Sequence, residues 1–139
     1  MRMSESELLY QYGYNWEIMY TLLQWWLSVS IGLLAIARFF PKKLNLFLVV
    51  LLILLYVSFS IYSIGGVNMF FQQNLGVLEE LRSLRADGSV SRAGELLLEQ
   101  MEGIWPVFAA SSYVVCVAGG FFGSIAFFIY SYRRGRLSA

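Results

Sequence analysis

The sequence lacks histidine altogether and has one cysteine, Cys116, among its 139 residues. With one thiol and no imidazole, a single chain cannot form an internal disulfide or the Cys and His ligand sets typical of zinc sites. It also lacks a phosphate-binding glycine loop, and no carboxylate falls within its long apolar runs. We therefore expect a protein that is not an enzyme and that uses no metal or cofactor.

Charge is also scarce, because only 14% of the residues are Asp, Glu, Lys or Arg and 58% are apolar. Soluble proteins carry about 25% charged residues. Three runs have no charged residue at all: 18–37, 44–78 and 107–132. Each reaches the roughly 20 residues that a helix needs to cross a bilayer. The sequence predicts an all-α polytopic membrane protein with three transmembrane helices.

The second run is too long for one bilayer crossing. As one helix, the 35 residues of 44–78 would extend roughly 50 Å, whereas the hydrocarbon core is about 30 Å thick. Paired glycines weaken a helix, so we expect it to break at Gly65-Gly66. The alternative is a helix that continues through the glycines as a rigid stalk.

The chain beyond these glycines changes character from uniformly apolar to amphipathic. Apolar residues in 67–104 recur every three or four positions with charged residues between them, and Asp87-Gly88 is a turn signal. This pattern predicts an extramembrane helical hairpin between the second and third transmembrane helices.

The beginning of the chain is polar and aromatic, with Tyr or Trp at every second position from Tyr10 to Trp16. Such side chains favour the lipid headgroup region, and Ser4 or Ser6 is suited to cap a helix. The predicted organisation is an interfacial segment (1–16), the first transmembrane helix (17–38), a cytoplasmic turn (39–43), the second transmembrane helix (44–66), an extracytoplasmic helical hairpin (67–104), the third transmembrane helix (105–132) and a basic cytoplasmic tail (133–139).

Orientation follows from the distribution of charge. The turn at 38–43 and the tail at 133–139 together hold six basic residues and no acidic one, whereas the N-terminal end through Glu17 and the hairpin hold four arginines and all nine acidic residues. Three spans place these two groups on opposite sides, and short basic loops stay in the cytoplasm. We predict insertion in the plasma (inner) membrane with the N-terminus outside and the C-terminus cytoplasmic.

Small residues form a pattern in the third apolar run. They recur every four positions from Ser112 to Ser124, beside a Gly-x-x-x-Gly motif, and such faces let two helix backbones approach closely. The predicted helix-packing residues are Ser112, Cys116, Gly119, Gly120, Gly123 and Ser124.

The second arm of the predicted hairpin carries an acidic face made of Glu95, Glu99 and Glu102. One interpretation is a solvated face partly neutralised by arginines, for which Arg82, Arg85 and Arg92 are available. The other is a docking or cation-attracting surface, which a ring of subunits would repeat as an acidic vestibule.

Gln24 and Ser28 are candidates for an intramembrane polar contact in the first apolar run. Polar side chains in such helices usually face protein, so we expect an interhelical hydrogen bond in preference to a pore lining.

Two function classes fit these features. The first is a non-catalytic accessory, regulatory or immunity-type subunit of a membrane assembly, acting through helix packing and the exposed hairpin. The second is a self-assembled oligomeric pore or ion channel, holin-like or effector-like. Its layout is similar to that of three-span phage holins, although no sequence motif supports that likeness. In both classes the partners are the lipid bilayer and either further copies of the chain or another membrane protein, with no nucleic acid.

Overall fold

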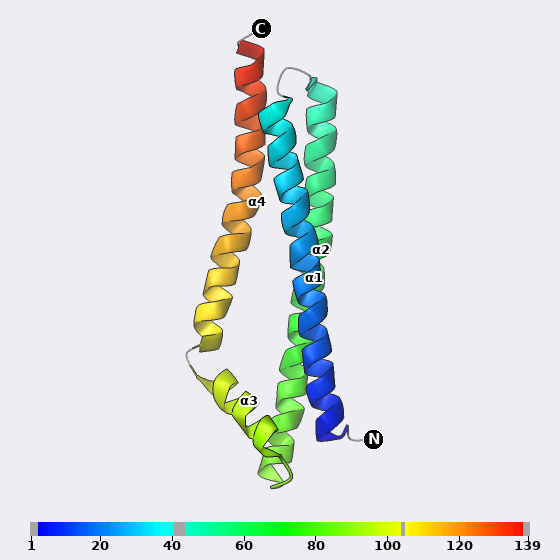
Figure 1. The fold of residues 1–139 in the computed structure, drawn as a ribbon, viewed down its shortest axis with the longest axis vertical. Coiled ribbons are helices and arrows are strands. Elements are labelled where there is room, and N and C mark those ends of the chain that lie inside the picture. The colour runs from blue at the N-terminus through cyan, green and yellow to red at the C-terminus, as the bar shows by residue number, and fades with distance from the viewer. Residues whose placement is uncertain (1–2, 41–43, 104, 138–139) are drawn as a thin grey trace. The chain divides into compact units, whose positions relative to one another are not determined.

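A computed structural model describes residues 3–40, 44–103 and 105–137 of the chain. The described part is all-helical and contains no strand, which confirms the predicted all-α class (Figure 1). α1, α2 and α4 are long and apolar enough to cross a membrane. The helices are α1 (Glu5–Phe39), α2 (Leu46–Ala86), α3 (Arg92–Glu102) and α4 (Trp105–Leu137).

α1 begins with a reciprocal cap between Ser4 and Glu7. The Ser4 N–H donates to Glu7 Oε2 at 2.8 Å, and the Glu7 N–H donates to Ser4 Oγ at 3.4 Å. Of the two serines expected as caps, Ser4 therefore satisfies backbone donors of the first turn. The predicted interfacial segment 1–16 continues into the first apolar run as one helix of 35 residues.

α2 shows that the expected helix break at Gly65-Gly66 was wrong, because the helix continues through both glycines for 41 residues. A glycine costs a helix only about 1 kcal/mol relative to alanine, and it keeps its N–H donor, unlike proline. The regular helix on both sides offsets that cost. A Cβ at Gly65 would meet nothing within 4 Å, so no close contact forces a bend there.

α2 ends at Ala86, where the chain turns through Asp87 and Gly88. Gly88 adopts φ +70°, a conformation that glycine reaches without the clash of a Cβ. The Ser89 N–H donates to the Leu84 carbonyl across this turn at 3.1 Å. The first-to-second helix connection was predicted at 39–43, and its residues 41–43 lie outside the described part. At the other end of the chain, α4 remains helical into the predicted tail.

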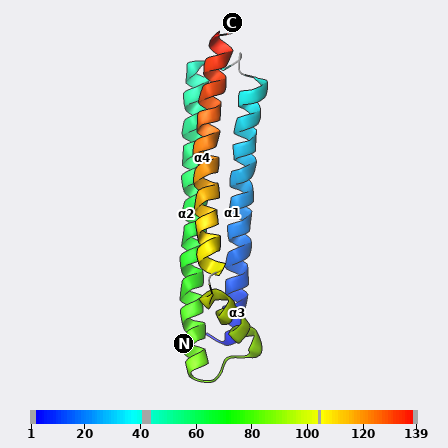
Figure 2. The same ribbon diagram turned by 90° about the vertical axis from the view of Figure 1, so that its left-hand side faces the viewer.

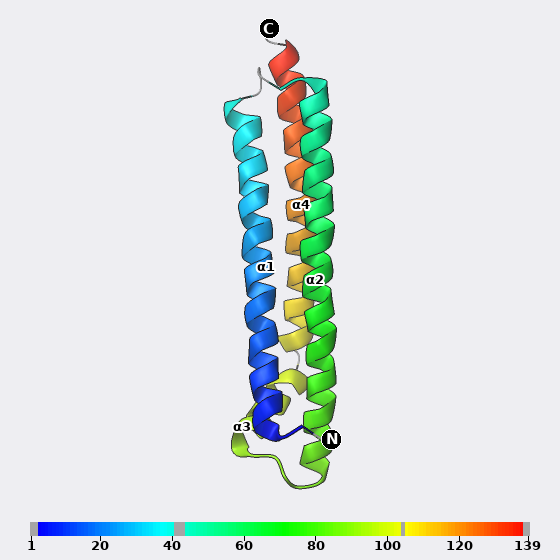
Figure 3. The same cartoon turned by 90° about the vertical axis from the view of Figure 1, so that its right-hand side faces the viewer.

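The chain forms two compact units, which we call unit 1 (Met1–Thr21 and Gly66–Ser112) and unit 2 (Leu22–Gly65 and Tyr113–Ala139). In unit 2, the segments of α1 and α4 run in the same direction and that of α2 runs opposite to them (Figures 1 and 3). Tyr56 of α2 stacks on Phe121 of α4 with ring centroids 5.6 Å apart. The buried core comprises Leu33, Ala37, Leu44, Val49, Tyr56, Phe128 and Tyr132.

Unit 1 combines the first half of α1, the second half of α2, the short helix α3 and the beginning of α4 (Figure 2). α3 is amphipathic, and its Leu98 is fully buried together with Leu81 of α2. Apolar burial between these helices holds α3 in place. The complete buried cluster is Leu8, Val77, Leu78, Leu81 and Leu98.

Candidate interaction surfaces

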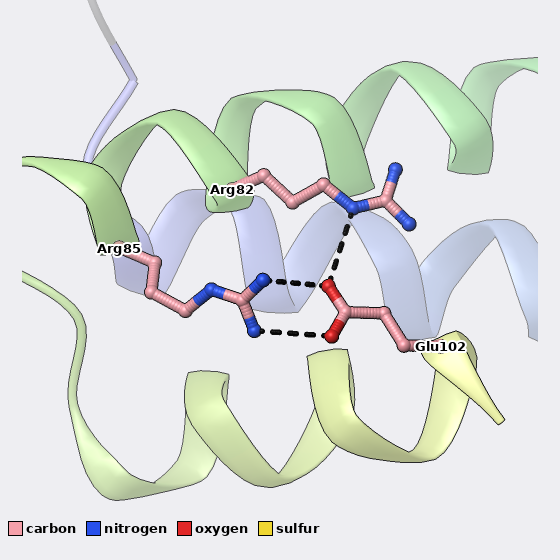
Figure 4. Close-up of polar contacts among 3 residues, drawn as sticks. All are labelled: Arg82, Arg85 and Glu102. Atoms are coloured by element: carbon pink, nitrogen blue, oxygen red, sulfur yellow. Dashed lines mark hydrogen bonds and ion pairs between the residues drawn. The ribbon is translucent and has the colours of Figure 1, made fainter.

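The acidic face of α3 is tied to α2 at its last residue, Glu102. The two terminal guanidinium nitrogens of Arg85 donate hydrogen bonds to the Glu102 carboxylate, at 2.6 Å to Oε1 and 3.3 Å to Oε2 (Figure 4). Arg82 Nε approaches the same Oε1 at 3.7 Å. Paired hydrogen bonds of this kind fix geometry as well as charge. The contact therefore joins the end of α3 to the last turns of α2.

These contacts also change the acidity of the groups. The hydrogen bond from Arg85 lowers the pKa of the Glu102 carboxyl, outweighing the opposing effect of desolvation. In return, the hydrogen bond to Glu102 raises the pKa of Arg85. The ionised pair is the favoured state at neutral pH.

The other two acidic residues of the face behave differently. Glu95 pairs with Arg92 of the same helix at 3.6 Å, with both side chains largely exposed. Exposed pairs of this type contribute little to stability. Glu99 is exposed and forms no ion pair within the part of the chain that the structure describes. The arrangement fits a solvated face that arginines partly neutralise, with Glu99 left toward solvent.

The first turn of α3 is capped by a residue from a different helix, a contact that was not predicted from the sequence. Both oxygens of Glu5 of α1 accept hydrogen bonds from the Ser91 N–H, at 3.0 and 3.2 Å, and Oε1 also accepts one from the Ser91 hydroxyl at 2.6 Å. A carboxylate at a helix N-terminus satisfies free N–H donors and complements the helix dipole. These hydrogen bonds lower the pKa of Glu5.

Gly94 leaves room for this cap. A Cβ at Gly94 would lie 2.5 Å from Glu5 Oε1 and 2.7 Å from Val90 Cγ1. A larger residue would push the flexible Glu5 carboxylate away from the helix start. α3 is therefore held at one end by Glu5 and at the other by its own Glu102.

A buried amide pair links α1 and α2 inside unit 1. Asn15 Nδ2 donates to Asn74 Oδ1 at 2.9 Å, and the two side chains are 0% and 3% exposed. Asn74 Nδ2 has no protein partner among the described residues. This pair was not predicted from the sequence. The signal was available, because Asn15 continues the three-four spacing set by Leu8, Met19 and Leu22.

Unit 2 has its own interhelical hydrogen bonds, made by neutral groups. Trp26 Nε1 donates to Ser60 Oγ at 2.9 Å, and the hydroxyls of Ser30 and Tyr56 lie 2.9 Å apart. Both pairs are buried and join α1 to α2. Such bonds satisfy polar groups that the hydrocarbon core cannot solvate.

Gln24 and Ser28, the predicted intramembrane contact, lie on an exposed face of α1. The Ser28 hydroxyl donates to the backbone carbonyl of Gln24 at 2.8 Å, which is a bond within the helix. The interhelical bonds are made by Trp26 and Ser30, each two residues further along and therefore on another face of α1. Within one chain, Gln24 and Ser28 remain open to a second molecule.

The predicted helix-packing residues of α4 also differ in exposure: some contact their own chain and others are exposed. A Cβ at Gly120 would lie 2.8 Å from the Trp26 ring, and Ser124 is buried, so both contact their own chain. Cβ atoms at Gly119 and Gly123 would meet nothing within 4 Å. The exposed members of the predicted face are Ser112, Cys116, Gly119 and Gly123.

Comparison with known protein families, curated proteins and solved structures yields no match for this chain.

Proposed function

We propose that this chain is a three-span integral membrane protein with its N-terminus outside and its C-terminus in the cytoplasm. In this proposal it acts without catalysis, by packing α4 against another membrane helix and displaying α3 outside. It would serve as an accessory, regulatory or immunity-type subunit of a membrane assembly. The open space around Gly119 and Gly123 is the observation that carries the proposal.

These two glycines are four residues apart, so they lie one above the other on the same side of α4. Without side chains at these positions, a second helix backbone can approach closely, and dispersion contacts then drive association where lipid offers no hydrophobic force. α4 is also the least buried of the three long helices over its apolar stretch, where 11% is buried, compared with 28% for α1 and 22% for α2. A partner helix on the glycine face would cover part of it.

A self-assembled pore or ion channel is the second candidate, and the exposure of Gln24 and Ser28 favours it. These residues are four apart on α1, so they share one side of an otherwise apolar stretch. In a ring of subunits they would supply amide and hydroxyl groups to a conduit. A ring of subunits would also repeat Glu99 and so gather negative charge on the extramembrane part of the assembly.

The test compares Gly119→Leu/Gly123→Leu with Phe122→Leu. Phe122 lies on the same helix and is 68% exposed, so Phe122→Leu changes the size of a side chain without blocking the glycine face. We expect the glycine variant to lose assembly, measured as molar mass by light scattering after mild detergent extraction, and Phe122→Leu to retain it. Equal effects of the two variants would refute packing through the glycines.

Flux measurements separate the two candidates. The purified protein is placed in liposomes loaded with a potassium-sensitive dye. A homo-oligomer that conducts potassium would refute the accessory role, whereas a protein that assembles with a different membrane protein and does not conduct would refute the pore.

A further inference from the structure

One end of unit 2 gathers positive charge. Ala37 of α1 and Tyr132 of α4 belong to the same buried cluster, so the residues that follow them, Arg38 and Arg133, lie at the same end of unit 2. Both arginines are exposed. The sequence has no acidic residue at 38–43 or 133–139 to offset them. This end therefore presents a basic surface.

A shallow open groove of about 360 Å³ lies between α1 and α4 and includes Arg38 of this basic end. Its lining from α1 is Ile31, Leu34, Ala35 and Arg38, and from α4 it is Phe127. The four α1 positions follow the spacing of one helix face, which extends about 10 Å from Ile31 to Arg38. A shallow apolar groove thus ends at a guanidinium.

The chemistry of this lining is that of a lipid. An acyl chain needs an apolar surface that is open to the bilayer, and Ile31 and Phe127 are 57% and 40% exposed along the groove. A phosphate diester needs a cation at the level of the headgroups, and a guanidinium can donate two parallel hydrogen bonds to it. Phe39, which follows Arg38 and is 74% exposed, is suited to the interface.

We propose that this groove binds an anionic phospholipid of the cytoplasmic leaflet, with an acyl chain along Ile31, Ala35 and Phe127 and the phosphate on Arg38. The site rests on the membrane placement proposed above, which puts Arg38 at the cytoplasmic surface. Charge complementarity selects the occupant: basic pockets between transmembrane helices on that side bind anionic headgroups, whereas a zwitterionic lipid offers no net charge to Arg38.

The experiment is native mass spectrometry of the full-length protein in detergent micelles. The protein is titrated with phosphatidylglycerol and, separately, with phosphatidylcholine that has identical acyl chains. One basic residue near the headgroups contributes about fivefold in affinity, so wild type should hold phosphatidylglycerol about fivefold more tightly than phosphatidylcholine. Arg38→Gln should reduce phosphatidylglycerol binding to the phosphatidylcholine level.

The matched control is Arg133→Gln, which removes the same charge from the same end but outside the groove lining. It should change phosphatidylglycerol affinity less than twofold if the lipid is held locally by Arg38, and not by diffuse charge. Ala35→Phe, which fills the groove, should weaken both lipids while circular dichroism confirms that the helices remain.

Equal affinity of wild type for the two lipids would overturn the proposal, as would equal losses in Arg38→Gln and Arg133→Gln. Neither result depends on orientation or on a protein partner, because the measurement uses micelles. Failure here is therefore distinguishable from failure of the glycine-face assembly.

Discussion

In both units, polar side chains join α1 to α2, but the chemical groups differ. Unit 1 uses a buried amide pair, and it fastens α3 with the carboxylates of Glu5 and Glu102. Unit 2 uses an indole and hydroxyls. Ionised side chains are expensive in hydrocarbon and inexpensive beside water, whereas neutral paired groups are tolerated in both. Among the described residues, the ionised contacts of unit 1 are therefore of the kind that water tolerates, and the neutral contacts of unit 2 are of the kind that either environment tolerates.

The largest effect should come from the leucine cluster of unit 1. Leu98→Ala removes a fully buried side chain between α3 and α2, and such truncations cost about 2 to 5 kcal/mol. We expect much faster amide hydrogen exchange throughout α3, measured by mass spectrometry.

The control for this variant is Leu96→Ala, on the same helix. Leu96 is 49% exposed, so its truncation should leave exchange in α3 nearly unchanged. If Leu98→Ala and Leu96→Ala increased hydrogen exchange in α3 equally, burial of Leu98 would not account for the docking of α3. The proposed contrast between the units would then fail.

A smaller effect should distinguish the polar pairs of the two units. Asn15→Ala leaves a second polar group of Asn74 unpaired in a buried site, which costs about 1 to 3 kcal/mol. Ser60→Ala removes the acceptor of the Trp26 bond while the indole ring stays in place, and hydrogen bonds between membrane helices average about 0.6 kcal/mol. Thermal unfolding in detergent should rank the first variant below the second, and the reverse order would contradict this assignment.

The smallest effect should be the response of α3 to acid. The pKa values of Glu5 and Glu102 are lowered in the folded protein from their ordinary value of 4.5. Both carboxylates therefore stabilise docked α3 above about pH 4.5, and this contribution is lost as the pH falls through their folded-state pKa values. Exchange in α3, corrected for the intrinsic effect of pH, should increase in that range.

Glu102→Gln should reduce this acid response, because glutamine cannot form the ionised pair with Arg85. Glu99→Gln is the matched control on the same face. An acid response that survives unchanged when both Glu5 and Glu102 are replaced by glutamine would show that other groups cause it.

The sequence predicted the helical class, the three long apolar helices and a cap at Ser4 or Ser6, because these depend on local composition and spacing. It also placed the turn at Asp87-Gly88, where a left-handed residue is needed. The helix break at Gly65-Gly66 was wrong because local propensity was weighed without the long helix on either side, which outweighs about 2 kcal/mol of glycine cost.

The interaction surfaces were harder to predict. That Glu102 faces Arg85 is consistent with the expected neutralisation by arginines, but the cap by Glu5 depends on where two distant segments meet. No periodicity within α1 or α3 encodes that contact. Asn15 was detectable as a polar member of an apolar stripe, although its partner Asn74 was not. Similarly, spacing identified the small face of α4 without showing that Gly120 turns inward and Gly119 outward.

The cap between Glu5 and Ser91 also has a consequence for the timing of biosynthesis. It joins residues 86 positions apart, whereas the Trp26–Ser60 bond spans 34 positions and the Ser30–Tyr56 bond spans 26. At a translation rate of about 5 to 20 residues per second, Ser91 is synthesised roughly 4 to 17 seconds after Glu5. During that interval the Glu5 carboxylate and Leu8 have no α3 to contact. The beginning of α1 is therefore synthesised first, but its tertiary contacts are among the last to form.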